Sequence, residues 1–200
     1  MLYHAPLLSG DGAKARLTSG DMMVGAMEQR RIVRRVAAGW ENVEREGYVP
    51  GLATAVVRHT LVGGRKTDAS DVGPQSEVRY FEVPPGAVTR LEKHEHEHYV
   101  IVGEGVGHAI VGHDVREVRQ HDVVYVAPLV PHQFVNRGGA PFGFFCMVSA
   151  ARDVSQELSG EEIERLMASP AGAYADPHGA PPPRKAAPVP LDGALERARS

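Results

Sequence analysis

Between Glu77 and Val148 the chain alternates short runs of β-branched and aromatic residues with residues that favour turns. The turn signals follow one another closely: Pro84-Pro85-Gly86, Gly103 to Gly107, Gly112-His113-Asp114, His121-Asp122, Pro128 to Pro131 and Gly138-Gly139. Many short strands at such spacing are typical of an antiparallel sandwich or barrel, and they argue against alternating βαβ units. We therefore expect an all-β core.

Two helices are expected outside this core. Apolar residues recur at helical spacing over residues 21–38, directly before a glycine that can end the helix. A short C-terminal helix is expected over residues 159–169, because Ser159 and Glu162 have the spacing of a capping box and a proline follows.

The length and composition suit one globular domain. The chain has 200 residues, of which 42% are apolar, and a formal net charge of −3. Residues 1–20 are interpreted as a loose arm and residues 21–158 as the barrel with its leading helix. The short helix at 159–169 is followed by a tail over 170–200, rich in proline and alanine, which we expect to supply no core.

Composition also limits the expected location and partners. No apolar run approaches the roughly 20 residues of a membrane-spanning helix, and the N-terminus lacks a secretory pattern, so a soluble, cytoplasmic protein is expected. Acidic and basic residues are interspersed, which predicts a small-molecule partner rather than nucleic acid or a membrane. The lone cysteine, Cys146, excludes an internal disulfide and is expected to be a small buried hydrophobic residue.

Histidine is concentrated in one region, since seven of the ten lie between His94 and His132. Side chains two apart on a strand share a face, so Glu92 and His94 are expected to point the same way, into the barrel. A short turn near His96 then brings His98 into the neighbouring antiparallel strand, with apolar residues on its inward face.

A second segment places another histidine after a turn bounded by prolines. His132 follows this turn, and Phe134 shares its face of the strand. Neutral imidazoles and a carboxylate are good ligands for divalent metal ions, and buried polar groups without a partner are costly. Three imidazoles and one carboxylate inside an apolar barrel therefore indicate a metal site with open positions.

The first of these segments resembles motif 1 of the cupin superfamily. In that family a glycine is followed by five residues, His-x-His, three or four residues, a glutamate, six residues and a glycine. Here Gly86 is followed by five residues, Glu92-Lys93-His94, three residues, His98, six residues and Gly105. Relative to the family, the carboxylate and one imidazole have exchanged places, so the set remains three histidines and one glutamate.

The second segment resembles cupin motif 2, which runs glycine, five residues, Pro-x-Gly, two residues, His, three residues and Asn. His132 and Asn136 fall at matching places, while His121, Ala127 and Leu129 replace the glycine, proline and glycine. The resemblance covers residues 77–150. It implies a small single-domain bacterial cupin with an antiparallel β-barrel of the double-stranded jelly-roll type, and a homodimer.

The expected ligands of one divalent metal ion are Glu92, His94, His98 and His132; iron, manganese, nickel, zinc and copper all stay open. Two alternatives remain: Glu92 can instead pair with Arg90 or Lys93, and His96 can replace it as a ligand. The residues expected to contact a substrate are His96, His108 and Phe134. His113 and His121 are interpreted as turn residues.

The resemblance implies an enzyme that acts on a small molecule, and a dioxygenase-type oxidoreductase is favoured. In that version Glu92 can also accept a substrate proton. A metal-dependent lyase or isomerase uses the same ligands, so the sequence does not separate these reactions. Two alternatives to an enzyme stay open. One is a non-catalytic cupin that binds or senses a small molecule, and the other is a barrel in which the metal only supports the fold.

Overall fold

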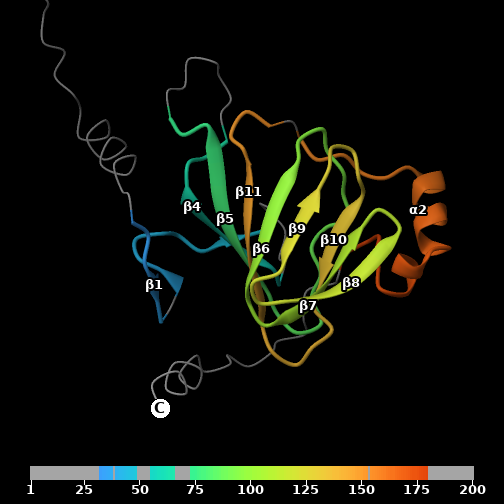
Figure 1. Ribbon diagram of the computed structural model, residues 1–200, viewed down its shortest axis with the longest axis horizontal. Coiled ribbons are helices and arrows are strands. Elements are labelled where there is room, and N and C mark those ends of the chain that lie inside the picture. Colours follow the sequence, from blue (N-terminus) through green and yellow to red (C-terminus); the bar gives the residue numbers. More distant parts are fainter. Residues whose placement is uncertain (1–31, 38, 49–54, 66–72, 153, 180–200) are drawn as a thin grey trace, which may run out of the picture. The chain divides into compact units, whose positions relative to one another are not determined.

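The computed structural model describes residues 32–37, 39–48, 55–65, 73–152 and 154–179, and short strands dominate them (Figure 1). The strands are β1 (Arg35–Val36), β2 (Gly39–Trp40), β3 (Glu46–Gly47), β4 (Val57–Val62), β5 (Ser76–Val83), β6 (His98–Glu104), β7 (Val106–Val111), β8 (Asp114–Arg119), β9 (Val123–Val126), β10 (His132–Val135) and β11 (Phe142–Ser149). Two short helices follow, α2 (Gly160–Met167) and the 3₁₀ helix η1 (Pro170–Ala173). The predicted all-β core is confirmed.

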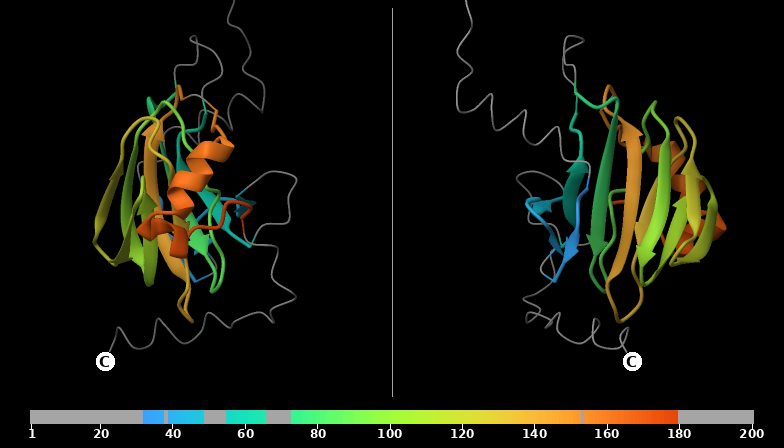
Figure 2. Two further views of the ribbon diagram at one scale, coloured as in Figure 1. Left: turned by 90° about the vertical axis from the view of Figure 1, so that its right-hand side faces the viewer. Right: turned by 60° about the vertical axis from the view of Figure 1, so that its left-hand side comes forward.

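The strands pair in antiparallel fashion, in the manner of a jelly roll. The larger sheet has the order β3-β4-β5-β11-β6-β9 and the smaller one β10-β7-β8, while β1 and β2 form a separate hairpin. The two larger sheets can be followed in Figure 2. Strand β11 lies between β5 and β6, which places Cys146 opposite Arg79 on one side and Val100 on the other. This arrangement confirms the fold expected from the sequence.

The main core lies between the sheets and is built from alternate residues of the strands. Val100 and Val102 on β6 are fully buried, as the predicted inward face requires. Phe144 on β11 stacks on Phe81 of β5, with ring centroids 5.2 Å apart, and contacts Phe134 of β10 at 4.4 Å. The interior of the barrel is therefore walled by packed aromatic rings of β5, β10 and β11.

A second, smaller core joins the short helices to the barrel. Leu166 of α2 and Ala171 of η1 are buried with Ile110 of β7 and Val135 of β10, and Tyr174 packs against this cluster. The expectation that the chain supplies no core beyond residue 170 is therefore wrong for this part. Residues 180–200 lie outside the described residues.

Of the two predicted helices, the structure confirms the C-terminal one. Ser159 caps α2 and its side chain accepts a hydrogen bond from the Glu162 backbone, while the Glu162 carboxylate accepts one from the Ser159 backbone. The predicted helix over residues 21–38 is wrong for residues 32–37, which contain β1 and no helix. Arg35 there lies 5.4 Å from the Tyr80 ring centroid and forms an ion pair with Glu82, so tertiary contacts override the local pattern. The rest of the predicted helix lies outside the described residues.

Both glycines of motif 1 have the left-handed backbone that favours glycine. Gly86 has φ 76° and Gly105 has φ 72°. A Cβ at Gly105 would lie 2.2 Å from the carbonyl oxygen of Pro141, so that turn also needs the space that glycine leaves. The two glycines that bound motif 1 are thus each required by a turn whose backbone is left-handed.

The chain keeps the same backbone where motif 2 has lost its glycines. His121 has φ 77° and Leu129 has φ 60°, at the positions where the family has glycine. Hydrogen bonds hold both turns, because His121 donates its backbone N–H to Val102 at 2.9 Å and Leu129 donates to His94 at 2.7 Å. The turn at Leu129 is therefore tied directly to a predicted metal ligand.

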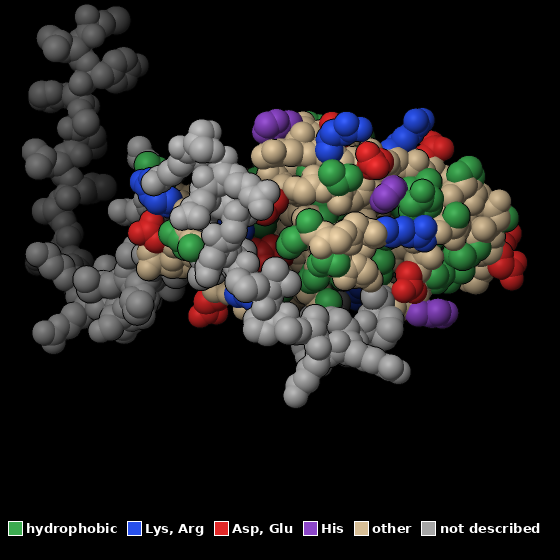
Figure 3. Space-filling model, turned by 90° about the horizontal axis from the view of Figure 1, so that it is seen from below, with side chains coloured by type: hydrophobic (Ala, Val, Ile, Leu, Met, Phe, Trp, Pro, Cys, Tyr) green, Lys and Arg blue, Asp and Glu red, His purple; other side chains and the backbone are tan. Residues whose placement is uncertain are grey.

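The surface carries charges of both signs. Figure 3 shows one face, on which acidic, basic and hydrophobic side chains are interspersed rather than gathered into a patch of one sign. Among the described residues, no helix has the length and apolar character needed to span a membrane.

Candidate metal centre

Three histidines from two different motifs come together inside the barrel. His98 begins β6, His132 begins β10, and His94 lies in the bent segment that leads into β6. One ring nitrogen of each lies within 4.8 Å of those of the other two, and all three side chains are buried. Backbone hydrogen bonds between Glu92 and His132 in both directions, at 3.0 and 3.3 Å, hold the motif 1 segment against β10.

In two of these rings a backbone carbonyl oxygen occupies Nδ1 and leaves Nε2 as the nitrogen that can bind a metal. His94 Nδ1 lies 2.9 Å from the His96 carbonyl oxygen, and His132 Nδ1 lies 3.0 Å from that of Val130. Nε2 of His94 is buried and has no hydrogen-bond partner among the described residues. A buried imidazole nitrogen with an unused lone pair is costly unless it binds something, so this donor set fits a divalent metal ion.

Burial keeps the imidazoles of His98 and His132 in the neutral form that a metal ligand requires. Desolvation lowers the pKa of His132 to about 4, with the neighbouring His94 acting in the same direction. Burial, and then the nearby His132 and His94 rings, also hold the pKa of His98 far below its usual range. At neutral pH these two rings therefore offer lone pairs rather than positive charges.

Glu92, the fourth predicted ligand, lies beside the three-histidine group without being part of it. Its carboxylate Oε1 accepts a hydrogen bond of 2.8 Å from the Tyr48 hydroxyl. Burial, followed by the negative charge of Glu92, raises the pKa of Tyr48 well above its usual value. The sequence left open a pairing of Glu92 with Arg90 or Lys93. In the structure Arg90 forms an ion pair with Glu157 instead. Lys93 instead bonds Glu162 of α2, and the role of Glu92 as a ligand stays a prediction.

The predicted alternative ligand, His96, is at the bend before β6 and touches two of the three histidines. Its ring stacks on that of His94 with centroids 3.7 Å apart, and its Nε2 lies 3.1 Å from Nε2 of His98. It also borders an outer groove of about 440 Å³, together with Glu95, Glu97 and Tyr99. The contact between His96 and a substrate stays a prediction, and the place of His96 at the edge of this groove is suitable for such a contact.

The cavity at the cluster is small and mostly apolar, with a volume of about 40 Å³. Phe134 lines it, as strand alternation predicted. Three further residues of the lining, Tyr48, Arg79 and Cys146, were not expected there. Alternation along a strand puts Arg79 on the same side as Phe81 and Cys146 on the same side as Phe144, but it does not tell which strands border the histidines.

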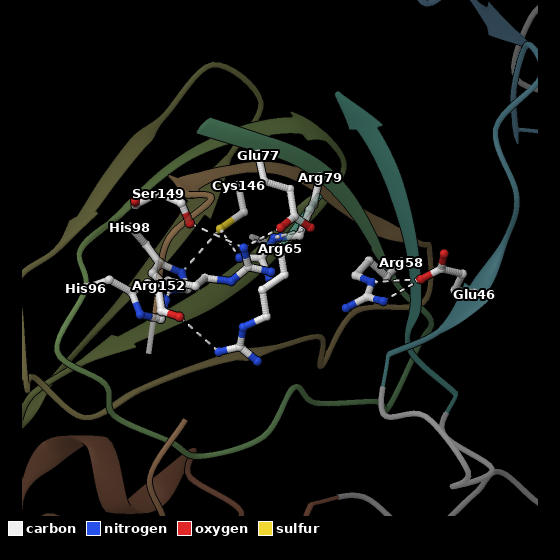
Figure 4. Close-up of polar contacts among 10 residues, drawn as sticks. All are labelled: Glu46, Arg58, Arg65, Glu77, Arg79, His96, His98, Cys146, Ser149 and Arg152. Atoms are coloured by element: carbon white, nitrogen blue, oxygen red, sulfur yellow. Dashed lines mark hydrogen bonds and ion pairs between the residues drawn. The ribbon is translucent and has the colours of Figure 1, made fainter. Parts of the chain in front are cut away.

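Cys146 and Arg79 form a buried polar pair next to His98 (Figure 4). Arg79 Nη2 lies 3.3 Å from Cys146 Sγ, and Sγ lies 3.2 Å from His98 Nδ1. Glu77 lies behind Arg79 and forms an ion pair with Arg152. Burial raises the pKa of the Cys146 thiol, and the positive charge of Arg79 opposes that shift. Cys146 is thus buried, as expected, but it faces the site.

His108 does not line this cavity, although the sequence placed it among the substrate contacts. Its ring packs on Tyr174, with centroids 4.6 Å apart, at the second core. Asn136, matched to motif 2, organises the turn after β10, because its side-chain nitrogen donates to the carbonyl oxygens of Val83 and Ala140. His113 and His121 lie in turns, as interpreted from the sequence.

Comparisons with known proteins agree with this geometry. The family model described as "Cupin domain" matches residues 79–148. The 1-methylthio-D-xylulose 5-phosphate methylsulfurylase of Rhodospirillum rubrum is 37% identical over 130 residues, which cover 65% of this chain and 78% of that protein.

Solved structures of cupin-2 domain proteins are similar along most of their length. One from Rhodospirillum rubrum is 34% identical with a TM-score of 0.59, and the match covers 72% of this chain and 93% of that one. One from Rhodopseudomonas palustris is 30% identical with a TM-score of 0.59, covering 69% and 93%. This chain belongs to the cupin superfamily, and its three-histidine cluster is compatible with a metal site.

Proposed function

We propose that this protein is a metal-dependent enzyme that acts on a small carbonyl compound carrying a methylthio group, of the kind named for its Rhodospirillum rubrum relative. The observation that carries the proposal is the 37% identity with 1-methylthio-D-xylulose 5-phosphate methylsulfurylase over 130 residues. A cavity lined by two of the three clustered histidines, His98 and His132, together with the thiol of Cys146 supports it.

The metal would be held by His94, His98 and His132, and when bound it would supply Lewis-acid polarisation of a carbonyl oxygen. Cys146 presents a thiol to the same cavity and is the side chain of the lining able to bond to sulfur. Glu92 can take a substrate proton, because its carboxylate faces the cavity and its other contact is the neutral Tyr48 hydroxyl.

The direct test is turnover of 1-methylthio-D-xylulose 5-phosphate by the metal-loaded protein. The assay is run with and without a small-molecule thiol as acceptor for the methylthio group. Its sulfur would form a disulfide with the methylthio sulfur, while the electron pair of the broken carbon–sulfur bond and the thiol proton pass to the carbon, which becomes a methyl group. Mass spectrometry follows the disulfide. We expect turnover by the wild type and by His113→Ala, a control at an exposed hairpin tip, and none by His94→Ala or Cys146→Ser. Absence of turnover in the loaded wild type, or full activity in His94→Ala, would contradict the proposal.

A dioxygenase-type oxidation, which the sequence favoured, uses the same three histidines and is the competing proposal. Oxygen uptake separates the two, because cleavage of a carbon–sulfur bond with a thiol acceptor consumes no dioxygen. Substrate-dependent oxygen consumption by the iron-loaded protein would favour oxidation. Substrate binding without any turnover would favour a binding or sensing role.

A further inference from the structure

Arg79 is a buried cation that has no hydrogen-bonded anion among the described residues. It lies on β5, is 8% exposed and lines the cavity at the three-histidine cluster. Its Nη2 lies 3.3 Å from Cys146 Sγ, and burial raises the pKa of that thiol, so this partner is uncharged at neutral pH. Its Nε is buried and has no hydrogen-bond partner in the described part of the chain. A buried charge in this situation is costly, and it calls for a physical explanation.

The carboxylate of Glu77 compensates this charge only in part, because two guanidinium groups share it. Arg152 forms the close ion pair with Glu77 Oε2, whereas Arg79 Nε lies 4.0 Å from Glu77 Oε1, beyond the length of a hydrogen bond (Figure 4). All three side chains are at most 10% exposed. One buried negative charge therefore stands against two buried positive charges beside the cavity.

The other carboxylate at this cavity, that of Glu92, accepts its hydrogen bond from Tyr48, and among the described contacts no ion pair joins it to Arg79. Arg58 on β4 shows the contrast, because its Nε donates to Glu46 Oε2 at 3.2 Å and its Nη2 bonds the same oxygen (Figure 4). Arg79 thus keeps a donor that no described group uses, next to a cavity of about 40 Å³ with room for a few atoms.

We propose that Arg79 holds a small anionic oxygen group in this cavity, and that in the proposed reaction this group is the enolate oxygen of the substrate. The inference rests on the proposed function for the origin of the anion. The electron pair of the broken carbon–sulfur bond is shared with the neighbouring carbonyl, whose oxygen carries negative charge until the carbon takes up a proton.

Glu92 can hold the thiol proton during that interval and then pass it to the carbon, so that the negative charge moves from its carboxylate to the substrate and back. Arg79 supplies a fixed positive charge in the same cavity throughout, because a guanidinium group stays protonated. A buried donor of this kind stabilises an anionic oxygen more than a neutral carbonyl oxygen.

The test is binding of formate to the metal-free protein, with a chelator present and at neutral pH, where His98 and His132 are uncharged. In the wild type the titration is followed by the ¹H–¹⁵N resonance of Arg79 Nε–H. We expect formate to shift this resonance in a saturable way, whereas formamide, an uncharged molecule of similar size, should not.

Variants are compared through the backbone amide resonances of the residues that line the cavity. Arg79→Met should weaken formate binding roughly 10–100-fold, as loss of a hydrogen bond to a charged group does. Arg79→Lys keeps the charge and should retain part of the affinity. Arg58→Met is the matched control and should bind formate as the wild type does, because Arg58 is already paired with Glu46. Glu92→Gln should tighten binding, since it removes a negative charge from the cavity.

The proposal is overturned if formate leaves the Arg79 resonance unchanged, if folded Arg79→Met binds formate as tightly as the wild type, or if Arg58→Met loses binding equally. If Arg79→Met does not fold, the wild-type titration and Arg79→Lys decide. Formate binding at Arg79 without turnover of the methylthio compound would keep the anion site and remove the proposed reaction. Turnover without formate binding would keep the reaction and remove the anion site.

Discussion

Acidification of the metal-free protein should destabilise the fold through the buried histidines, and His132 allows the size of the effect to be worked out. Desolvation lowers its pKa to about 4, whereas an exposed histidine has a pKa of about 6.5. Between these two values the unfolded chain binds a proton at this position that the folded chain does not bind. The contribution is therefore fully present above about pH 6.5 and is lost as the pH falls toward 4.

The expected magnitude follows from the difference between the two pKa values. Each pKa unit corresponds to about 1.4 kcal/mol, so His132 alone should cost about 3 kcal/mol of unfolding free energy across this pH range. The pKa of His98 is lowered in the same direction, also mainly by burial, and adds to the loss. A bound metal would oppose protonation, because the ligands must be neutral.

The assay is urea unfolding with a chelator present, at a series of pH values from about 7 down to about 4. The variant His132→Asn has no imidazole at this position to take up a proton. Over this pH range it should therefore lose about 3 kcal/mol less unfolding free energy than the wild type. His121→Asn, at an exposed turn, is the control and should follow the wild type. If wild type and His132→Asn lost stability in parallel, the assigned burial of a neutral imidazole would be refuted.

Three further outcomes are expected. Glu92→Gln should keep its metal affinity within about tenfold of the wild type, because Glu92 lies outside the three-histidine group; a loss beyond about 100-fold in a chelator competition would make it a ligand. Gly107→Ala should cost about 1–3 kcal/mol in denaturant unfolding, since its Cβ would lie 2.4 Å from the Phe142 ring, and an unchanged midpoint would contradict this packing. Ser159→Ala should cost about 1 kcal/mol and speed amide exchange in α2, and unchanged exchange there would argue against the cap.

The barrel could be predicted because each of its short strands carries its own local signal. Turn residues such as Gly86 and Gly105 occupy left-handed positions that few other residues tolerate, and the spacing between them is visible in the sequence. The helix expected over residues 21–38 shows the opposite case. The apolar residues there do recur at helical spacing, but Arg35 contacts Tyr80 and Glu82, and contacts between residues so distant in sequence are not visible in local periodicity.

Of the metal centre, the sequence predicts the residues that belong to the two motifs and misses those that lie outside them. His94, His98 and His132 sit at positions whose spacing alone suggests convergence. Cys146 and Arg79 could not be placed beside them, because their contact depends on the pairing of β5 with β11, and the register between two strands distant in sequence is set by the whole sheet. The cysteine was therefore interpreted from its apolar neighbours alone.

The most direct test of the metal centre is the metal content of protein purified without added metal, measured in the wild type and in the His94→Ala, His98→Ala and His132→Ala variants. We predict about one divalent ion per chain in the wild type and in the control His113→Ala, and a large loss in each of the three variants. Equal metal content in all five folded proteins would contradict the assignment of these three histidines as ligands.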